Sequence, residues 1–239
     1  MSVTTEVAIH GDKVPPPGPV SFEEFLEWLD EDTLAEWVDG EIIMTSPASS
    51  EHQDIRDFLV KVMGLYVEER RLGKVVSAPF VMRIVAHPSG REPDLFFITN
   101  EHLDRLQPTY LDGPADLVVE IISIESDARD RGDKFIEYEA SDVPEYWLID
   151  PLRRHVDFYQ LGPDGRYHSG PLDEAGVYHS PSLAGFWLKP EWLWQQPLPD
   201  VAWAAAQIGG VEHARASLAA LRSALGFDEL RKLLDESES

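Results

Sequence analysis

The chain has 239 residues, 43% of them hydrophobic, with seven tryptophans and no cysteine. It can therefore bury a sizeable core, whereas disulfides and thiolate metal sites are excluded, and we expect a reducing cytoplasm as its compartment. The net charge of −24 argues against nucleic-acid binding over the whole surface, because phosphate contacts need lysine and arginine. Most of the 20 basic residues lie in the middle of the chain, so a local basic patch with a divalent metal ion could still bind a polyanion.

The N-terminal segment has neither a cationic start nor an apolar stretch, and so does not resemble a signal peptide. No apolar run approaches the roughly 18 residues that a membrane helix needs, so we expect no membrane span. Residues 1–20 contain few apolar residues and the stretch VPPPGP, which predicts a flexible N-terminal arm.

Two capping-box patterns predict the first helices. Ser21 with Glu24 precedes a short apolar stretch, and Ser50 with Gln53 precedes apolar residues at helical spacing. Gly73 is placed to end the second of these helices. Between them, two apolar runs in LAEWVDGEIIM are joined by Asp39-Gly40, a pattern typical of a β-hairpin.

From residue 75 onward the periodicity favours strands. We expect strands in VVSAPFVMRIVA and PDLFFIT with a turn at PSGRE between them, then DLVVEIIS, EYWLID and HVDFYQ. DLVVEIIS is nearly all apolar, which predicts a strand buried on both faces.

The remaining segments complete an α+β fold. Short helices are expected at residues 100–106 and 128–140, and residues 171–199, rich in proline and tryptophan, predict irregular structure with tryptophans packed in the core. Residues 201–239 should be helical, broken at Gly209-Gly210 and at Gly226. We therefore expect a flexible arm at 1–20, a main domain at 21–199 and a helical C-terminal extension at 200–239.

Two carboxylates stand on apolar strands. Asp94 follows Pro93 at the start of PDLFFIT, and Glu120 lies inside DLVVEIIS. Burying a carboxylate among valine, leucine and isoleucine is costly unless its charge is compensated. The compensation could be an arginine or a turn, or it could be a divalent cation such as Mg²⁺ or Mn²⁺, which prefers oxygen ligands.

Between Leu34 and about Leu161, five short sequence motifs, called words below, bear on whether a cation or a protein group compensates these carboxylates. They are AEWVDGEIIMTSPASSEHQ, REPDLFFI, PADLVVEIIS, DARDRGDKFIEYEASDVPEYWLIDP and HVDFY. In this order and spacing they resemble the Uma-two family of restriction endonucleases, within the PD-(D/E)XK nuclease superfamily. The resemblance implies a restriction-endonuclease-like fold, a central mixed β-sheet flanked by helices, with the active site where two neighbouring strands diverge.

The resemblance also implies roles for residues. Asp94 and Glu120 correspond to the two metal-binding acids, which would hold Mg²⁺ or Mn²⁺. In the superfamily a lysine lies two residues after the second acid, but this chain has Ile122 there. Lys134 could replace that lysine from the following helix, where Arg131, Lys134 and Tyr138 would share one face. Alternatively, Lys134 is solvated and pairs locally with Asp130 or Glu137.

Further candidates come from the same words. His52, on the helical face of Ile55 and Leu59, should point toward the sheet and either orients a ligand or water near the metal or is a structural histidine. Glu36 resembles an additional acid of the superfamily, and Glu41 competes for that role. Two strand arginines could contact phosphate but more often pair with a nearby acid, namely Arg83 and Arg91.

The function expected from these residues is metal-dependent hydrolysis of phosphodiester bonds, with DNA as the substrate and a homodimer as the assembly. The homodimer rests on apolar residues within 201–206 and 218–225. Two alternatives remain open. One is a nuclease-fold binding or scaffold protein with little catalysis, and the other is a nuclease that acts on RNA or structured DNA.

Overall fold

The structure is a computed structural model of the whole chain, and it describes residues 13–30, 32–45, 48–123 and 126–236. The helices are α1 (Phe22–Trp28), α2 (Ser50–Arg70), α3 (Asp127–Arg131), α4 (Asp133–Ala140), α5 (Val201–Leu225) and α6 (Phe227–Glu236), with 3-10 helices η1 (Asn100–Arg105) and η2 (Pro190–Trp194). The strands are β1 (Ala35–Val38), β2 (Glu41–Met44), β3 (Gly73–Ser77), β4 (Val81–Ile84), β5 (Ser89–Arg91), β6 (Leu95–Thr99), β7 (Tyr110–Asp112), β8 (Leu117–Ile121), β9 (Glu145–Asp150), β10 (His155–Leu161), β11 (Tyr167–Ser169), β12 (Tyr178–His179) and β13 (Trp187–Leu188).

The predicted central sheet is accompanied by a second large sheet. A six-stranded mixed sheet has the order β11-β10-β9-β8-β6-β3, and a five-stranded mixed sheet has the order β2-β1-β5-β4-β7. The run VVSAPFVMRIVA was expected to form one strand, but it forms β3 and β4 in different sheets, because the chain turns at Ala78-Pro79. The expected turn at PSGRE is also wrong, since β5 pairs with both β1 and β4.

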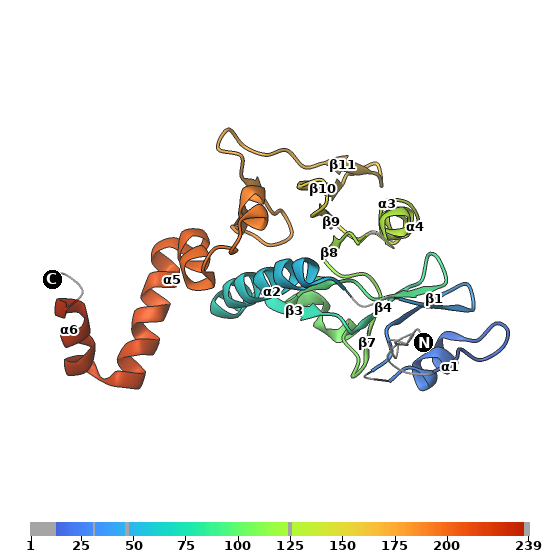
Figure 1. Cartoon of the computed structure of the whole chain (residues 1–239), viewed down its shortest axis with the longest axis horizontal. Helices are drawn as coiled ribbons and strands as arrows, with labels where there is room; N and C mark the ends of the chain where they lie inside the picture. The colour runs from blue at the N-terminus through green and yellow to red at the C-terminus, as the bar shows by residue number, and fades with distance from the viewer. Residues whose placement is uncertain (1–12, 31, 46–47, 124–125, 237–239) are drawn as a thin grey trace, which may run out of the picture.

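The six-stranded sheet has hydrophobic core on both faces. Leu117, Val119 and Ile121 of β8 pack with α2 and the segments that follow β11, whereas Val118 packs with Tyr138 of α4 and with residues from the five-stranded sheet. Every residue of β8 is buried, as its apolar sequence predicted. Figure 1 shows α2 on one side of this sheet and α3 with α4 on the other, beside β9 and β10.

Local sequence signals account for most element ends. The capping box of Ser21 and Glu24 begins α1, and Asp39 and Gly40 join β1 to β2 with positive φ angles of 50° and 90°. The start of α2 differs by one residue, because the side chain of Ser49, and not of Ser50, accepts a hydrogen bond from the His52 amide.

Two further helix boundaries differ from expectation. Helix α2 ends at Arg70 with Arg71 in the left-handed conformation, so Gly73 begins β3 and does not end the helix. The single helix expected at 128–140 is two helices, α3 and α4, because the backbone of Gly132 is not helical.

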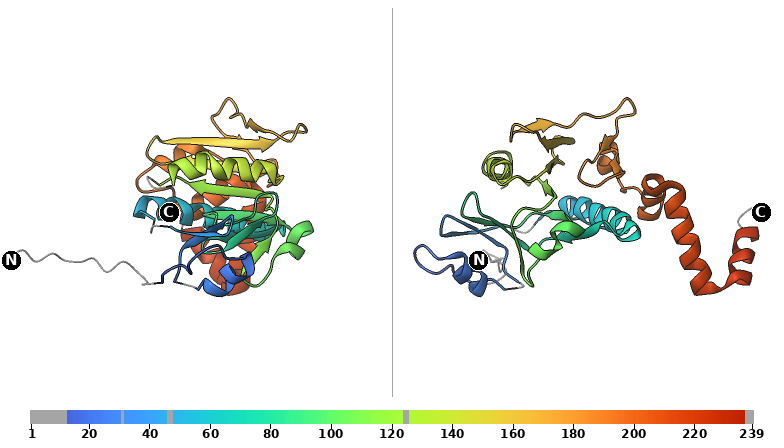
Figure 2. Two further views of the ribbon diagram at one scale, coloured as in Figure 1. Left: turned by 90° about the vertical axis from the view of Figure 1, so that its right-hand side faces the viewer. Right: turned by 180° about the vertical axis from the view of Figure 1, so that it is seen from behind.

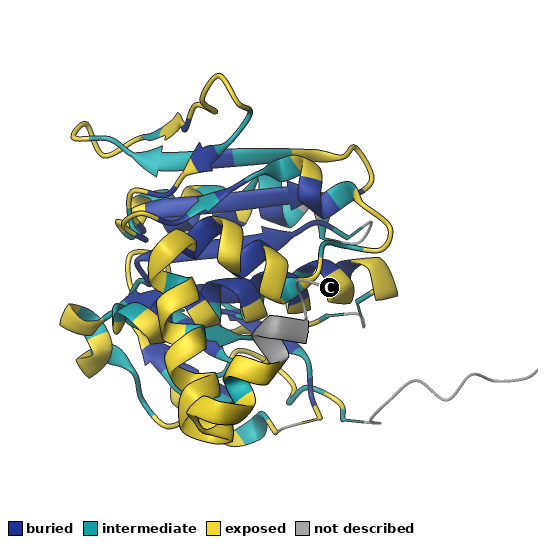
Figure 3. Cartoon of the chain, turned by 90° about the vertical axis from the view of Figure 1, so that its left-hand side faces the viewer, coloured by how far each residue is buried: buried dark blue, intermediate teal, exposed yellow. Residues whose placement is uncertain are grey.

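The C-terminal region is helical with breaks at the predicted glycines. Gly210 has a non-helical φ of 56° within α5, and Gly226 separates α5 from α6. Trp192 is buried in the core, with Trp187 and Trp194 packed against it. In Figures 1 and 2 the second half of α5 and α6 extend away from the sheets, and Figure 3 colours most of this arm as exposed.

The expected flexible arm at 1–20 falls largely outside the described residues, and residues 13–20 contain neither helix nor strand. The proposed boundaries at 20 and 199 therefore stay predictions. In the portion of the chain that the structure describes, no helix combines the length and apolar character needed to cross a membrane.

Candidate active site

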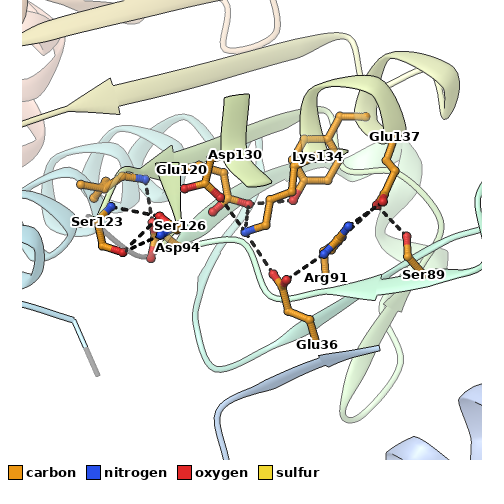
Figure 4. A network of polar contacts seen from close by, with 12 residues as sticks. Glu36, Ser89, Arg91, Asp94, Glu120, Ser123, Ser126, Asp130, Lys134 and Glu137 are labelled. Atoms are coloured by element: carbon orange, nitrogen blue, oxygen red, sulfur yellow. Dashed lines mark hydrogen bonds and ion pairs between the residues drawn. The ribbon is translucent and has the colours of Figure 1, made fainter. Parts of the chain in front are cut away.

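Asp94 and Glu120 lie on neighbouring strands. Asp94 directly precedes β6, and because Leu95 pairs with Val119 in an antiparallel ladder, Asp94 stands opposite Glu120 of β8. Both line a cavity of about 130 Å³. The adjacency expected from the sequence is therefore present, and Figure 4 shows the two side chains near each other.

The side chain of Asp94 is held by its surroundings. Its Oδ2 accepts a hydrogen bond from the Ile121 amide at 2.6 Å and lies 3.1 Å from His52 Nε2. His52 is buried in the first turn of α2 and faces the site as its helical position predicted. Its Nδ1 has no hydrogen-bond partner among the described residues, so its only described polar side-chain contact is with Asp94.

Lys134 projects from α4 into the carboxylates. Its Nζ lies 3.0 Å from Glu120 Oε1, 3.0 Å from Glu36 Oε1 and 3.2 Å from Asp130 Oδ1, and the residue is 5% exposed. Burial alone would lower the pKa of Lys134, but the carboxylates of Glu120, Glu36 and Asp130 outweigh it and hold the pKa well above its usual value. Lys134 is thus a buried ammonium group at the site and is not solvated, although it does make the local pair with Asp130 that the alternative expected.

Glu36 and Glu41 lie in different surroundings. Glu36 is buried on β1, between Lys134 and Arg91, whereas Glu41 is exposed. Burial would raise the pKa of Glu36, but Lys134 and Arg91 reverse this and lower it. Figure 4 shows the resulting chain of ion pairs, in which Arg91 also binds Glu137.

The two strand arginines pair with acids. Arg91 is fully buried, with Nη1 2.9 Å from Glu36 and Nη2 2.5 Å from Glu137. Arg83 is more exposed and lies 3.7 Å from Glu23 and 3.6 Å from Asp112. Neither arginine lines the cavity.

The predicted face of Arg131, Lys134 and Tyr138 is only partly correct. Tyr138 donates a hydrogen bond of 2.7 Å to Glu120 Oε1, so it shares the site with Lys134. Arg131 instead belongs to α3 and binds Asp150 and Asp157. The break between α3 and α4 turns Arg131 away from the face of Lys134.

The site includes acids that sequence reasoning did not assign to it. Asp130 is buried beside Lys134, and Glu92 lines the same cavity. Burial, and next the charge of Glu36, raise the pKa of Glu92 to about 8. The available signals were the i, i+4 spacing of Asp130 and Lys134 and the presence of Glu92 in the same sequence word as Asp94.

The donor set suits a hard divalent cation. Burial raises the pKa of Glu120 to about 8; the charge of Lys134 opposes this shift, and the charges of Asp130, Asp94 and Glu36 add to it. A bound cation would favour the ionised form of this carboxyl group. Oδ1 of Asp94 and Oε2 of Glu120 have no hydrogen bond to a described residue. No group of three potential ligands is gathered closely enough to hold a metal within the described ranges. Two carboxylates still fit Mg²⁺, which usually completes its shell with water and phosphate.

The sheet topology and the juxtaposed acids and lysine define a restriction-endonuclease-like protein. The sequence pattern of the Uma2 family, described as "Putative restriction endonuclease", matches residues 22–191, and the chain therefore belongs to this family.

Two further proteins are similar to this chain. The chain is 28% identical over 160 residues to "Uncharacterized protein slr1290" of Synechocystis sp., covering 65% of this chain and 81% of that protein. A crystal structure from Anabaena variabilis, titled as a "putative nuclease belonging to DUF820", superposes with a TM-score of 0.62. It is 20% identical, covering 74% of this chain and 98% of the other, so this likeness shows the fold alone.

Proposed function

We propose that this protein is a metal-dependent endonuclease that hydrolyses phosphodiester bonds in DNA. The observation that carries the proposal is the position of Lys134. Ile122 cannot supply the positive charge of the superfamily lysine, and its side chain is buried in the core. The ammonium group of Lys134 reaches Glu120 from α4 and restores a lysine beside the second acid.

Each residue of the cavity has a different proposed role. Asp94 and Glu120 would hold Mg²⁺ or Mn²⁺, which when bound neutralises charge on the scissile phosphate and activates water. His52 fixes one oxygen of Asp94, so that the other is directed to the ligand position. Lys134 stays protonated and offsets negative charge that develops on the phosphate. Glu36 positions the ammonium group of Lys134 from the opposite sheet.

DNA is proposed from the family description, and RNA or structured DNA are outcomes that a substrate screen can distinguish. We further propose a homodimer and, because the chain has no cysteine, a cytoplasmic location.

A second candidate is a nuclease-fold binding protein with little catalysis. Lys134 and Tyr138 both contact Glu120 Oε1, which leaves one oxygen of this acid for a cation. The net charge of −24 also opposes binding of a polyanion.

The test compares Asp94→Asn and Glu120→Gln with the wild type on labelled DNA in Mg²⁺ and in Mn²⁺. These changes keep the shape of each side chain but remove a charged ligand, so cleavage should fall by about 10³-fold or more. Mn²⁺ affinity, measured by calorimetry, should fall in parallel. Glu174→Gln alters an exposed acid and serves as the control, which should behave as the wild type.

Equal cleavage by all four proteins would identify a contaminating nuclease. Mn²⁺ binding that depends on both acids, without cleavage of DNA or RNA, would favour the binding protein.

A further inference from the structure

The cavity has a buried floor and a more open rim. Glu36, Glu120, Asp130 and Lys134 form the floor, each at most 5% exposed. The lining contains two arginines, Arg56 from α2 and Arg129 from α3, and neither of them is buried. These two arginines are called the arginine pair.

Arg129 lines the cavity and has one unused hydrogen-bond donor. Its Nε is shielded from solvent and has no hydrogen-bond partner in the part of the chain that the structure describes. A shielded donor without an acceptor is costly, so such a group needs an explanation, and a bound ion or ligand is one. Arg131, two residues further along, is instead committed to Asp150 and Asp157.

Helix α3 is anchored, so Arg129 is held at the rim. Arg131 binds the buried Asp150 at the end of β9, and Tyr146 donates a hydrogen bond of 3.0 Å to the backbone carbonyl of Asp130. Both contacts are made by the residues that directly follow Arg129, and they hold this end of the helix against β9. Little conformational freedom of the helix would be lost when Arg129 binds a ligand.

Arg56 is held only loosely. Its partner is Asp57, the next residue, with Arg56 Nη2 3.0 Å from Asp57 Oδ1 and the Asp57 side chain 51% exposed. Surface pairs of this kind contribute little to stability. Arg56 can therefore exchange Asp57 for a stronger acceptor at low cost.

We propose that the arginine pair binds backbone phosphates of the nucleic acid on either side of the scissile bond. Guanidinium groups bind phosphate with paired hydrogen bonds, and two of them on different helices can hold two points of one strand. The acidic floor repels a polyanion, so the rim must supply the attraction that brings the strand to the cavity. This inference rests on the proposed function and names the contacts that its substrate makes.

The test measures binding separately from cleavage. A fluorescein-labelled 20-base-pair DNA duplex is titrated with protein in Ca²⁺ at several salt concentrations, and anisotropy gives Kd. Arg56→Ala and Arg129→Ala should each weaken binding by about 10-fold, as expected for one charge-assisted contact, and lower the salt slope by about 1. Arg56→Lys and Arg129→Lys should keep the slope and lose part of the affinity.

The matched control is Arg166→Ala, which removes the same charge from an exposed arginine paired with Glu139 on another part of the molecule. A second pair of variants uses the acids of α2. Asp57→Asn releases Arg56 and should tighten DNA binding by about 2–5-fold, because the competing surface pair is weak. Asp54→Asn, an exposed acid of the same helix, should change binding less.

Three outcomes separate the pair from the proposed function. Arginine-dependent binding without cleavage supports the pair and counts against the nuclease. If the wild type cleaves DNA but Arg56→Ala and Arg129→Ala bind it as tightly as Arg166→Ala does, the proposed role of the arginine pair is overturned and the proposed nuclease is not. If the wild type does not bind the duplex at all, the proposed role of the arginine pair is also overturned. Mn²⁺ affinity should be unchanged in both arginine variants.

Discussion

At Lys134 a single ammonium group faces the carboxylates of Glu36, Glu120 and Asp130, all of them buried. Removing one partner from a buried cluster of this kind leaves the remaining charges uncompensated. The lysine therefore has two consequences, one for stability and one for chemistry, which different measurements can separate.

Replacing Lys134 with alanine should lower turnover by about 10²-fold, as for the loss of other charge-stabilising groups. The metal-free protein should also lose about 3–5 kcal/mol of stability, because buried carboxylates lose a counter-ion. Thermal unfolding and cleavage assays well below the melting temperature measure the two effects. Mn²⁺ affinity should not fall, since lysine is not a ligand.

Two variants control this experiment. Lys134→Arg should recover only part of the turnover, because a planar guanidinium does not match a compact ammonium. Lys61→Ala removes an exposed lysine and should leave both quantities unchanged. If Lys134→Ala cleaves DNA as fast as the wild type, Lys134 has no part in the mechanism.

At the scale of elements, the position of α3 depends on the end of β9. Asp150 is buried there and accepts hydrogen bonds from Arg153, at 2.6 Å, and from Arg131 of α3. Burial alone would raise the pKa of Asp150, but the hydrogen bonds from Arg153 and Arg131 outweigh it and lower the pKa. The ionised carboxylate thus ties α3, with Arg129 and Asp130, to the sheet.

A lowered pKa makes this anchor dependent on pH. The stability that Asp150 contributes is present above the pKa of an unfolded aspartate, about 4, and is lost as the pH falls through the lower folded value. Asp150→Asn should therefore melt below the wild type at pH 7, and the difference should shrink below about pH 4. Thermal melts at pH 7, 5 and 3.5 measure this.

The outcome that contradicts the anchor is a difference in melting temperature that stays constant with pH. Asp164→Asn is the control, because its partners His168 and Arg166 lie on an exposed turn far from α3 along the chain. Weaker DNA binding by Asp150→Asn at pH 7 would further link the anchor to Arg129.

At the scale of the whole molecule, the arm formed by the second half of α5 and by α6 extends from the body. Its exposed apolar side chains include Val211, Leu218, Leu221, Leu225 and Phe227. Exposed apolar surface of this extent is typical of an interface. Of the two apolar stretches named from the sequence, 201–206 is partly packed into the core, with Ala204 and Ala205 buried, whereas the leucines of 218–225 are exposed. The homodimer expected from the sequence therefore has a candidate surface on the arm and not at 201–206.

Light scattering at micromolar concentration should give the mass of a dimer. The double change Leu218→Glu and Leu221→Glu should give a monomer, because charge in an apolar interface is costly. Leu152→Glu, at an exposed turn between β9 and β10, should leave the dimer intact. A monomeric mass for the wild type would refute the prediction.

The sequence alone determined the features that depend on neighbouring residues. The Asp39-Gly40 hairpin, the capping box at Ser21 and the buried strand β8 follow from backbone preference and apolar pattern. The apolar runs after Asp94 and around Glu120 predicted their strands, and the resemblance to the family implied that the two acids act together. The hairpin, cap and strand signals are local, so they need no knowledge of the packing.

Only the tertiary structure decided which charges meet. Glu36 and Lys134 are 98 residues apart in the numbering of the chain, yet their side chains are 3.0 Å apart, because the five-stranded sheet packs against α4. The non-helical backbone of Gly132 separates Arg131 from Lys134. Glu92 and Asp130 line the cavity because of the way the chain packs around it. The energy of a buried charge depends on every group around it, whichever part of the chain supplies that group.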